Sequence, residues 1–245
     1  EAVQRLLDEA LAAWKALPTT DRNPGTFDDP AGDPDADFVR ELPDMAITIR
    51  VHARELEDDG EGGFRAAPAR QGAHGGASFD HLWLREQDHR QLIQNDDRPG
   101  ATAPVPPTVV RRIARFHLVD NTRGEPPMWQ EHEVRKATMT LRIASCEDNL
   151  MRLSLTGLVH LETDDGDRGY RADLEGVIEA DISAGRIRRF DLVAIGDHWG
   201  EGTYTPGARP GKSRLGVAFT LAEGSQAADR VPPQAARDLR EYWGR

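Results

Sequence analysis

The sequence has little of several residue types, and each shortage excludes a class of protein. Cys146 is the only cysteine, so no disulfide can form within the chain. Aromatic residues make up 6% of the sequence and the formal net charge is −11, which argues against a non-specific grip on nucleic acid. No apolar run approaches the roughly 18–20 residues of a membrane-spanning helix. The sequence therefore predicts neither nucleic-acid binding nor a membrane span.

Short motifs that mark common active sites are absent as well. The chain contains no G-x-x-x-x-G-K-[ST], no G-x-S-x-G, no H-E-x-x-H and no C-x-x-C. The basic clusters are Arg111-Arg112 with Arg115 and Arg186 with Arg188-Arg189. Each lies in a strand-like pattern beside acidic neighbours, so we interpret both clusters as solvated strand faces.

The 245 residues, of which 38% are hydrophobic, are enough for one core. We expect a single β-rich domain over 1–245, with an antiparallel β core over 45–222. An N-terminal helix is predicted over 1–17, because apolar residues recur there at helical spacing until Pro18. A second helix is predicted over 233–243.

Alternation of apolar and polar residues is the clearest signal in the sequence. Residues 45–56, 136–195 and 215–222 alternate with a period of two, which indicates half-buried strands. Short polar turns interrupt 136–195, so this stretch predicts an antiparallel meander. We also expect a strand over 109–119, and we favour a pair of strands over 78–94.

Two glycines interrupt the inward-facing rows of this meander. Glycine inside a strand marks a bend or a close approach of main chain, so Gly157 and Gly176 indicate a strongly curved sheet. The expected fold is therefore mainly β: a curved antiparallel sheet, as a sandwich or an open or half barrel. The terminal helices are expected to pack on it, since the Trp14 helix needs an apolar partner.

The segment 195–204 is the most suggestive candidate site. Its glycines bracket polar side chains at the end of a predicted strand, where a loop can direct them into a cleft. Asp197, His198 and Glu201 are candidate metal ligands. Trp199 and Tyr204 are candidate ligand-binding residues. The alternative is a structural loop in which Trp199 caps the sheet and the acids face water.

Other histidines extend this hypothesis. His117 and Asp120 are predicted to meet His198 and Asp197 across the sheet, with Asp120 and Arg123 as further ligand-binding candidates. The alternative for His117 is a core histidine with a local partner. His81 and His89 are also candidate metal ligands. A strand would separate them by about 26 Å and a helix by about 12 Å, so sharing a metal requires a turn between them.

Three hypotheses of function follow. The first is a binding protein that holds a small molecule or an ion at the rim of the sheet. The second is a metal-dependent enzyme, a hydrolase or an oxidoreductase, with a divalent metal ion as cofactor near His198. The third is a structural or interaction protein that contacts a partner chain through its sheet edge or its acidic loops. The sequence leaves the oligomeric state open.

The chain begins at Glu1 and shows no signal-peptide pattern. A processed extracytoplasmic protein, periplasmic or secreted, would have this appearance, and that location is our expectation. A shortened form of a longer chain would look the same.

Overall fold

The computed structural model describes residues 2–22, 42–68, 76–93, 96–224 and 226–244. The chain divides into two compact units, Glu1–Val39 and Arg40–Arg245. The first contains α1 (Ala2–Ala16), the helix predicted at the N-terminus, and α2 (Thr19–Arg22). The side chains of Leu7, Leu11 and Trp14 on α1 are exposed, and the packing of this helix on the sheet stays a prediction. None of the helices in the described residues has the length and apolar character to cross a membrane.

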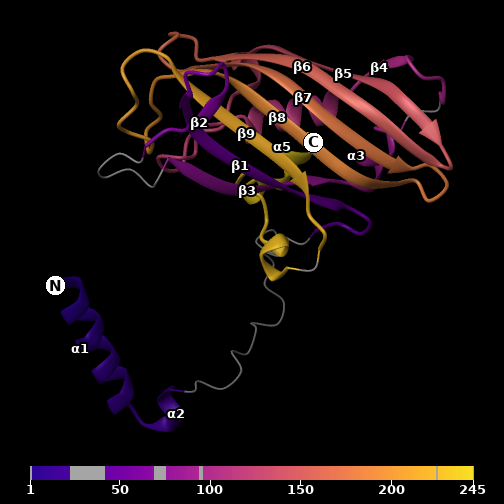
Figure 1. Ribbon diagram of the computed structural model, residues 1–245. Helices are drawn as coiled ribbons and strands as arrows, with labels where there is room; N and C mark the ends of the chain where they lie inside the picture. The colour runs from indigo at the N-terminus through magenta and orange to yellow at the C-terminus, as the bar shows by residue number, and fades with distance from the viewer. Residues whose placement is uncertain (1, 23–41, 69–75, 94–95, 225, 245) are drawn as a thin grey trace. The chain divides into compact units, whose positions relative to one another are not determined.

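The second unit is built on a nine-stranded antiparallel sheet, which Figure 1 shows as a curved layer. The strands run in the order β2-β1-β9-β8-β7-β6-β5-β4, and β3 pairs with β1 beside β2. The two ends of this order do not join, so the sheet is open rather than a closed barrel. The strands are β1 (Ile47–Asp58), β2 (Phe64–Ala66), β3 (Ala77–Leu84), β4 (Thr102–Pro104), β5 (Val134–Glu147), β6 (Leu150–Glu162), β7 (Gly169–Asp181), β8 (Arg186–Trp199) and β9 (Ser213–Leu221).

Strands β5 to β8 form the predicted meander. Leu155 of β6 lies opposite Leu141 of β5 and opposite Gly176 of β7, so the inward rows of neighbouring strands are aligned. Burial of such rows stabilises the fold by about 1.5–3 kcal/mol for each large apolar side chain. The buried inward side chains of the meander are Met139, Leu141, Ile143, Met151, Leu153, Leu155, Val159, Leu161, Tyr170, Ala172, Leu174, Ile178, Ala180, Ile187, Phe190, Leu192 and Ala194.

The two glycines in these rows lie where a neighbouring strand approaches closely. A Cβ atom on Gly157 would lie 2.5 Å from the Thr138 carbonyl oxygen. A Cβ atom on Gly176 would lie 2.5 Å from the Asp191 carbonyl oxygen. Neither position has room for a side chain, which is the close approach that the sequence predicted.

Helix α4 (Pro107–Arg112) and the π-helical turn η2 (Ile113–His117) pack against the inward face of the sheet, behind the strands in Figure 1. The prediction of a strand over 109–119 is therefore wrong. Pro107 starts α4 at a position that favours proline, because the missing N–H would have no helical partner there. The side chains that α4 and η2 add to the core are Val109, Val110, Ile113 and Ala114.

Two further segments differ from the sequence predictions. Residues 78–94 contain β3 followed by helix α3 (Glu86–Arg90) instead of two strands. The Asp88 carboxylate accepts the Arg85 N–H at 3.1 Å, which caps α3 locally. The predicted helix over 233–243 is divided into the 3-10 turn η5 (Gln234–Arg237) and α5 (Leu239–Trp243).

The free edge of β3 is covered by side chains rather than by another strand. The Tyr242 hydroxyl of α5 accepts the Trp83 N–H at 3.0 Å. Arg112 of α4 donates to the Trp83 carbonyl at 3.3 Å and to the Asp88 carboxylate at 2.8 Å. An uncovered strand edge invites pairing with other chains, so α4 and α5 protect this end of the sheet.

Candidate functional site

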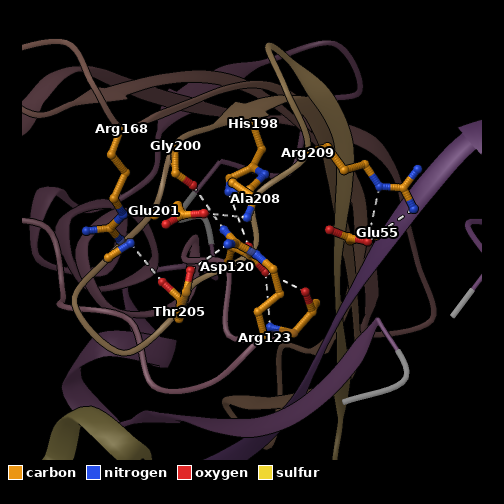
Figure 2. Close-up of polar contacts among 12 residues, drawn as sticks. Glu55, Asp120, Arg123, Arg168, His198, Gly200, Glu201, Thr205, Ala208 and Arg209 are labelled. Carbon is orange, nitrogen blue, oxygen red and sulfur yellow. Dashed lines mark hydrogen bonds and ion pairs between the residues drawn. The ribbon is translucent and has the colours of Figure 1, made fainter. Parts of the chain in front are cut away.

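A buried polar cluster lies where β8 ends at the glycine-rich loop (Figure 2). The Asp120 carboxylate oxygen Oδ2 lies 3.3 Å from Nε2 of His198 and 2.7 Å from Nε of Arg123. Its Oδ1 atom accepts the Thr122 N–H at 3.1 Å and the Thr122 hydroxyl at 2.6 Å. All four residues are buried. The structure therefore brings Asp120, Arg123 and His198 together.

Arg123 connects this cluster to the loop that follows β8. Its guanidinium donates to the carbonyl oxygens of Thr205 at 2.5 Å and Gly200 at 3.0 Å. Gly200 has φ +83°, and a Cβ atom there would lie 1.9 Å from the Asp167 carbonyl oxygen. Only glycine fits both this conformation and this close approach. The glycine of the loop thus places a carbonyl within reach of Arg123.

Burial and mutual charge set the protonation states of the cluster. Burial lowers the pKa of His198 more than the neighbouring Asp120 raises it. For Asp120, burial acts to raise the pKa, but the charge of His198, the Thr122 hydroxyl and the Arg123 guanidinium together lower it. Burial lowers the pKa of Arg168 to about 10. Its guanidinium lies 4.0 Å from the ring of Trp129.

These contacts indicate that the cluster mainly holds the loop in place. Each Asp120 oxygen is already occupied, and Arg123 uses its donors on Asp120 and on loop carbonyls. The Nδ1 atom of His198 is the one buried polar side-chain atom among these residues without a hydrogen-bond partner. A small ligand would have to displace buried ion pairs to enter.

His117 belongs to a second buried group. Its Nδ1 atom lies 3.4 Å from an Asp80 carboxylate oxygen, and its Nε2 atom lies 3.1 Å from the Tyr242 hydroxyl. The other Asp80 oxygen accepts the Gln234 N–H at 3.0 Å. His117 therefore has local partners and does not meet His198 or Asp197. This group ties the C-terminal segment to β3 and η2.

The remaining candidates of the glycine-rich loop point to separate partners. Asp197 accepts from Arg214 at 2.8 Å. Glu201 accepts the N–H groups of Gly207 and Ala208 at 2.7 and 2.8 Å. Trp199 donates its indole N–H to the Gly166 carbonyl at 3.0 Å, and Tyr204 is 73% exposed.

His81 and His89 also lie apart from the cluster. The Nε2 atom of His81 is 3.9 Å from Asp229, which accepts two hydrogen bonds from Arg50. The Nε2 atom of His89 is 3.0 Å from the Met45 carbonyl oxygen. Nowhere in the described part of the chain do three or more His, Cys, Asp or Glu side chains form a group that could hold a metal ion. The metal-site hypothesis therefore has no geometric support in these residues.

The buried histidines predict that mild acid destabilises the fold. Burial lowers the pKa of His81 and of His198 from their ordinary value of 6.5. The unfolded chain therefore binds protons at these side chains before the folded protein does, and the free energy of unfolding falls as the pH drops below about 6.5. We expect the urea midpoint to decrease between about pH 7.5 and 5.5.

Two variants test the assignment of this effect. His198→Gln should flatten the pH profile of the urea midpoint, because it removes one of the two histidines whose pKa is lowered by burial. His52→Gln changes an exposed histidine of β1 and should leave the slope unchanged. An unaltered slope in His198→Gln would contradict the assignment.

A groove lies between α4 and β5, and its lining contains no residue of the Asp120–His198 cluster. It has a volume of about 660 Å³, within the usual range for small-ligand sites. Its walls come from α4 and the residues before it, from η2 and η3 (Glu131–Glu133), and from the first half of β5. The apolar residues of the lining are Pro104, Val105, Pro107, Val110, Val134, Ala137 and Met139.

The charged side chains of the groove are mostly basic. Arg111, Arg115, Arg135 and Lys136 line it, against Glu131 as the one acidic lining residue. Arg111 lies 3.6 Å from Glu131, and Arg135 bonds to Asp164 at 2.8 Å. Lys136 is exposed, and no ion partner for it lies in the described residues. The groove therefore joins an apolar wall to a positive rim.

This groove could not be predicted from the sequence, because the pattern over 109–119 favoured a strand where α4 and η2 lie. The signal for a helix was present in Pro106-Pro107, because proline is favoured at the first position of a helix. Comparisons with protein-family models, with curated proteins and with solved structures found no match. The groove must therefore be interpreted from its own chemistry.

Proposed function

We propose that the protein is a binding protein and that the α4–β5 groove is its site, which takes a small, partly apolar ligand carrying negative charge. The main support for this proposal is that one groove of about 660 Å³ has both an apolar wall and a positively charged rim. Apolar surface supplies most of the affinity in such sites, and a few polar groups orient the ligand. The groove lies beside β5, near the β4 end of the strand order.

The chemistry of the rim favours an anion. Among the described residues, Lys136 has no ion partner, and the ion pair of Arg111 is a 3.6 Å contact with Glu131. A ligand carboxylate can bind either group without breaking a buried ion pair. By contrast, a ligand at Asp120 and Arg123 would have to replace contacts of 2.5 to 3.0 Å.

Decanoic acid, decan-1-ol and decylamine are suitable probes, because they share the apolar chain and differ in charge. We expect decanoate to raise the melting temperature progressively once its concentration exceeds its Kd, the alcohol to do so less, and the amine least. Lys136→Glu should weaken decanoate binding by about three- to tenfold at low salt, the size of an exposed charge contact that is reversed. Isothermal titration calorimetry gives both affinities.

Lys15→Glu is the matched control, since it makes the same charge change on α1, at an exposed position. It should bind decanoate like the parent protein. The proposal fails if no probe binds, if the three probes bind equally, or if the Lys15 and Lys136 variants lose affinity to the same extent.

A further inference from the structure

The lining of the groove shows that it runs along the edge of β5. Side chains of a strand alternate between its faces, so a pocket on one face is lined by every second residue. The α4–β5 groove is lined by every residue of β5 from Val134 to Thr140. The side chains of consecutive strand residues point to opposite faces, so a pocket that contacts all of them lies along the edge of the strand, where the main chain is accessible. The groove is therefore open to main-chain N–H and C=O groups as well as to side chains.

The hydrogen bonds beside the groove identify the open main-chain groups. The Met139 carbonyl accepts the Val105 N–H at 2.9 Å, and the Ile143 N–H donates to Ala101 at 2.9 Å. Both groups point away from β6, and such groups alternate along an antiparallel strand. By this alternation the N–H and C=O of Ala137 point to the same side, into the groove. Among the described residues, no strand lies beside Ala137.

Two features limit the length of the open edge. A register shift between Val134 and Lys136 marks a bulge at one end. The contact of Val105 with Met139 closes the other end. The stretch from Lys136 to Met139 spans roughly 14 Å at about 3.4 Å per residue. This length suits a short segment of extended chain.

The side chains of β5 specify what such a segment should carry. Ala137 and Met139 belong to the inward row, and Lys136 and Thr138 are exposed on the other face. An added strand places its side chains beside those of β5 on each face. Apolar side chains would then lie toward Val110, and acidic ones beside Lys136. The matching pattern is alternation of apolar and acidic residues.

Building on the groove proposed above as the binding site, we propose that its ligand is a short acidic peptide that binds in extended form as an added strand on the edge of β5. Main-chain hydrogen bonds to Ala137 supply affinity, as in other cases of strand addition. The apolar wall and the positive rim supply selectivity for the alternating pattern.

The probe is the acetylated, amidated peptide Val-Asp-Val-Glu-Val with a fluorescent label, followed by fluorescence polarisation. We expect it to bind more tightly than the matched peptide Val-Lys-Val-Lys-Val and to weaken as salt rises. Peptides carrying one N-methyl group at each position in turn form the decisive series. Methylation removes a donor, so every second position should lose about fivefold or more in affinity, and the positions between should lose little.

Variants of Ala137 test the same contact from the protein side. Ala137→Pro removes an N–H that faces away from β6, so it leaves the β5–β6 hydrogen bonds in place. It should weaken the peptide by about fivefold or more, whereas Ala137→Val, which keeps the N–H, should not. Melting curves of both variants report on folding, and the N-methyl series gives an answer that does not depend on them.

The outcomes separate this inference from the proposed function. A period-two pattern in the N-methyl series, with loss in Ala137→Pro, supports strand addition. Peptide binding without that pattern overturns it. Binding of decanoate but of no peptide also overturns it and leaves the proposed function standing. Binding of neither probe removes both.

Discussion

Replacing Asp120 by alanine is expected to lower the free energy of unfolding by about 3–5 kcal/mol, the cost of removing one partner from a buried ion pair. Asp120 and Arg123 are both buried, and their charged atoms lie 2.7 Å apart. Without the carboxylate, the guanidinium keeps its charge in a site with little water. Thr122 also loses the acceptor of two hydrogen bonds. Urea unfolding at neutral pH measures the change.

Two further variants show whether burial is the cause. Asp191→Ala removes the acid of an exposed pair with Arg189, so it should cost only about 0–1 kcal/mol. The double variant Asp120→Ala with Arg123→Met removes both charges, and it should be less destabilised than Asp120→Ala alone. A loss in Asp120→Ala no larger than that in Asp191→Ala would contradict the buried cluster.

The strands of the meander could be predicted because their signal is local. Apolar residues at every second position fix which side of a strand is buried, and short polar turns fix which strands are neighbours. The inward rows that contain Leu153 and Leu155 on β6 and Ile178 on β7 could therefore be predicted without knowing which distant residues pack against them. An open sheet was among the predicted alternatives. The sequence could not decide between a sandwich and an open or half barrel, because that choice depends on how the ends of the sheet pair.

Helix α4 shows where local pattern fails. The stretch from Val109 to Leu118 has apolar residues whose spacing fits a strand and a helix about equally, and its arginines suggested a solvated face. Arg112 and Arg115 are in fact buried, and they donate to the carbonyls of Trp83 and Trp129. A buried arginine needs partners from elsewhere in the fold, and no local pattern reveals them.

The candidate site was predicted in part. Of the contacts predicted among the candidate residues, the one between Asp120 and His198 is present, at 3.3 Å. The predicted meeting of His117 with His198 was not found, since His117 contacts Asp80 and Tyr242 instead. Histidine spacing in a sequence sets only an upper limit on distance. The partner that a buried histidine finds depends on tertiary packing.

The C-terminal helix is the second place where a single side chain has a large expected effect. Tyr242 is buried against Phe116 at a ring distance of 5.4 Å, and its hydroxyl joins the Trp83 N–H to His117. Burial raises the pKa of this hydroxyl, so it remains a neutral donor and acceptor. Loss of the residue therefore removes core packing and uncovers the edge of β3 together.

Tyr242→Ala is expected to lower the free energy of unfolding by about 3–5 kcal/mol, as for other buried aromatic side chains cut to alanine. Tyr242→Phe keeps the ring but leaves the Trp83 N–H and a nitrogen of His117 without a partner, so it should cost about 1–3 kcal/mol. Tyr204→Ala and Tyr204→Phe are the controls, since Tyr204 is 73% exposed and should change stability by no more than about 0.5 kcal/mol. Equal effects of the phenylalanine and alanine variants at Tyr242 would show that the hydroxyl, not the ring, carries the interaction. Effects at Tyr242 as small as those at Tyr204 would mean that α5 does not cover β3 in solution.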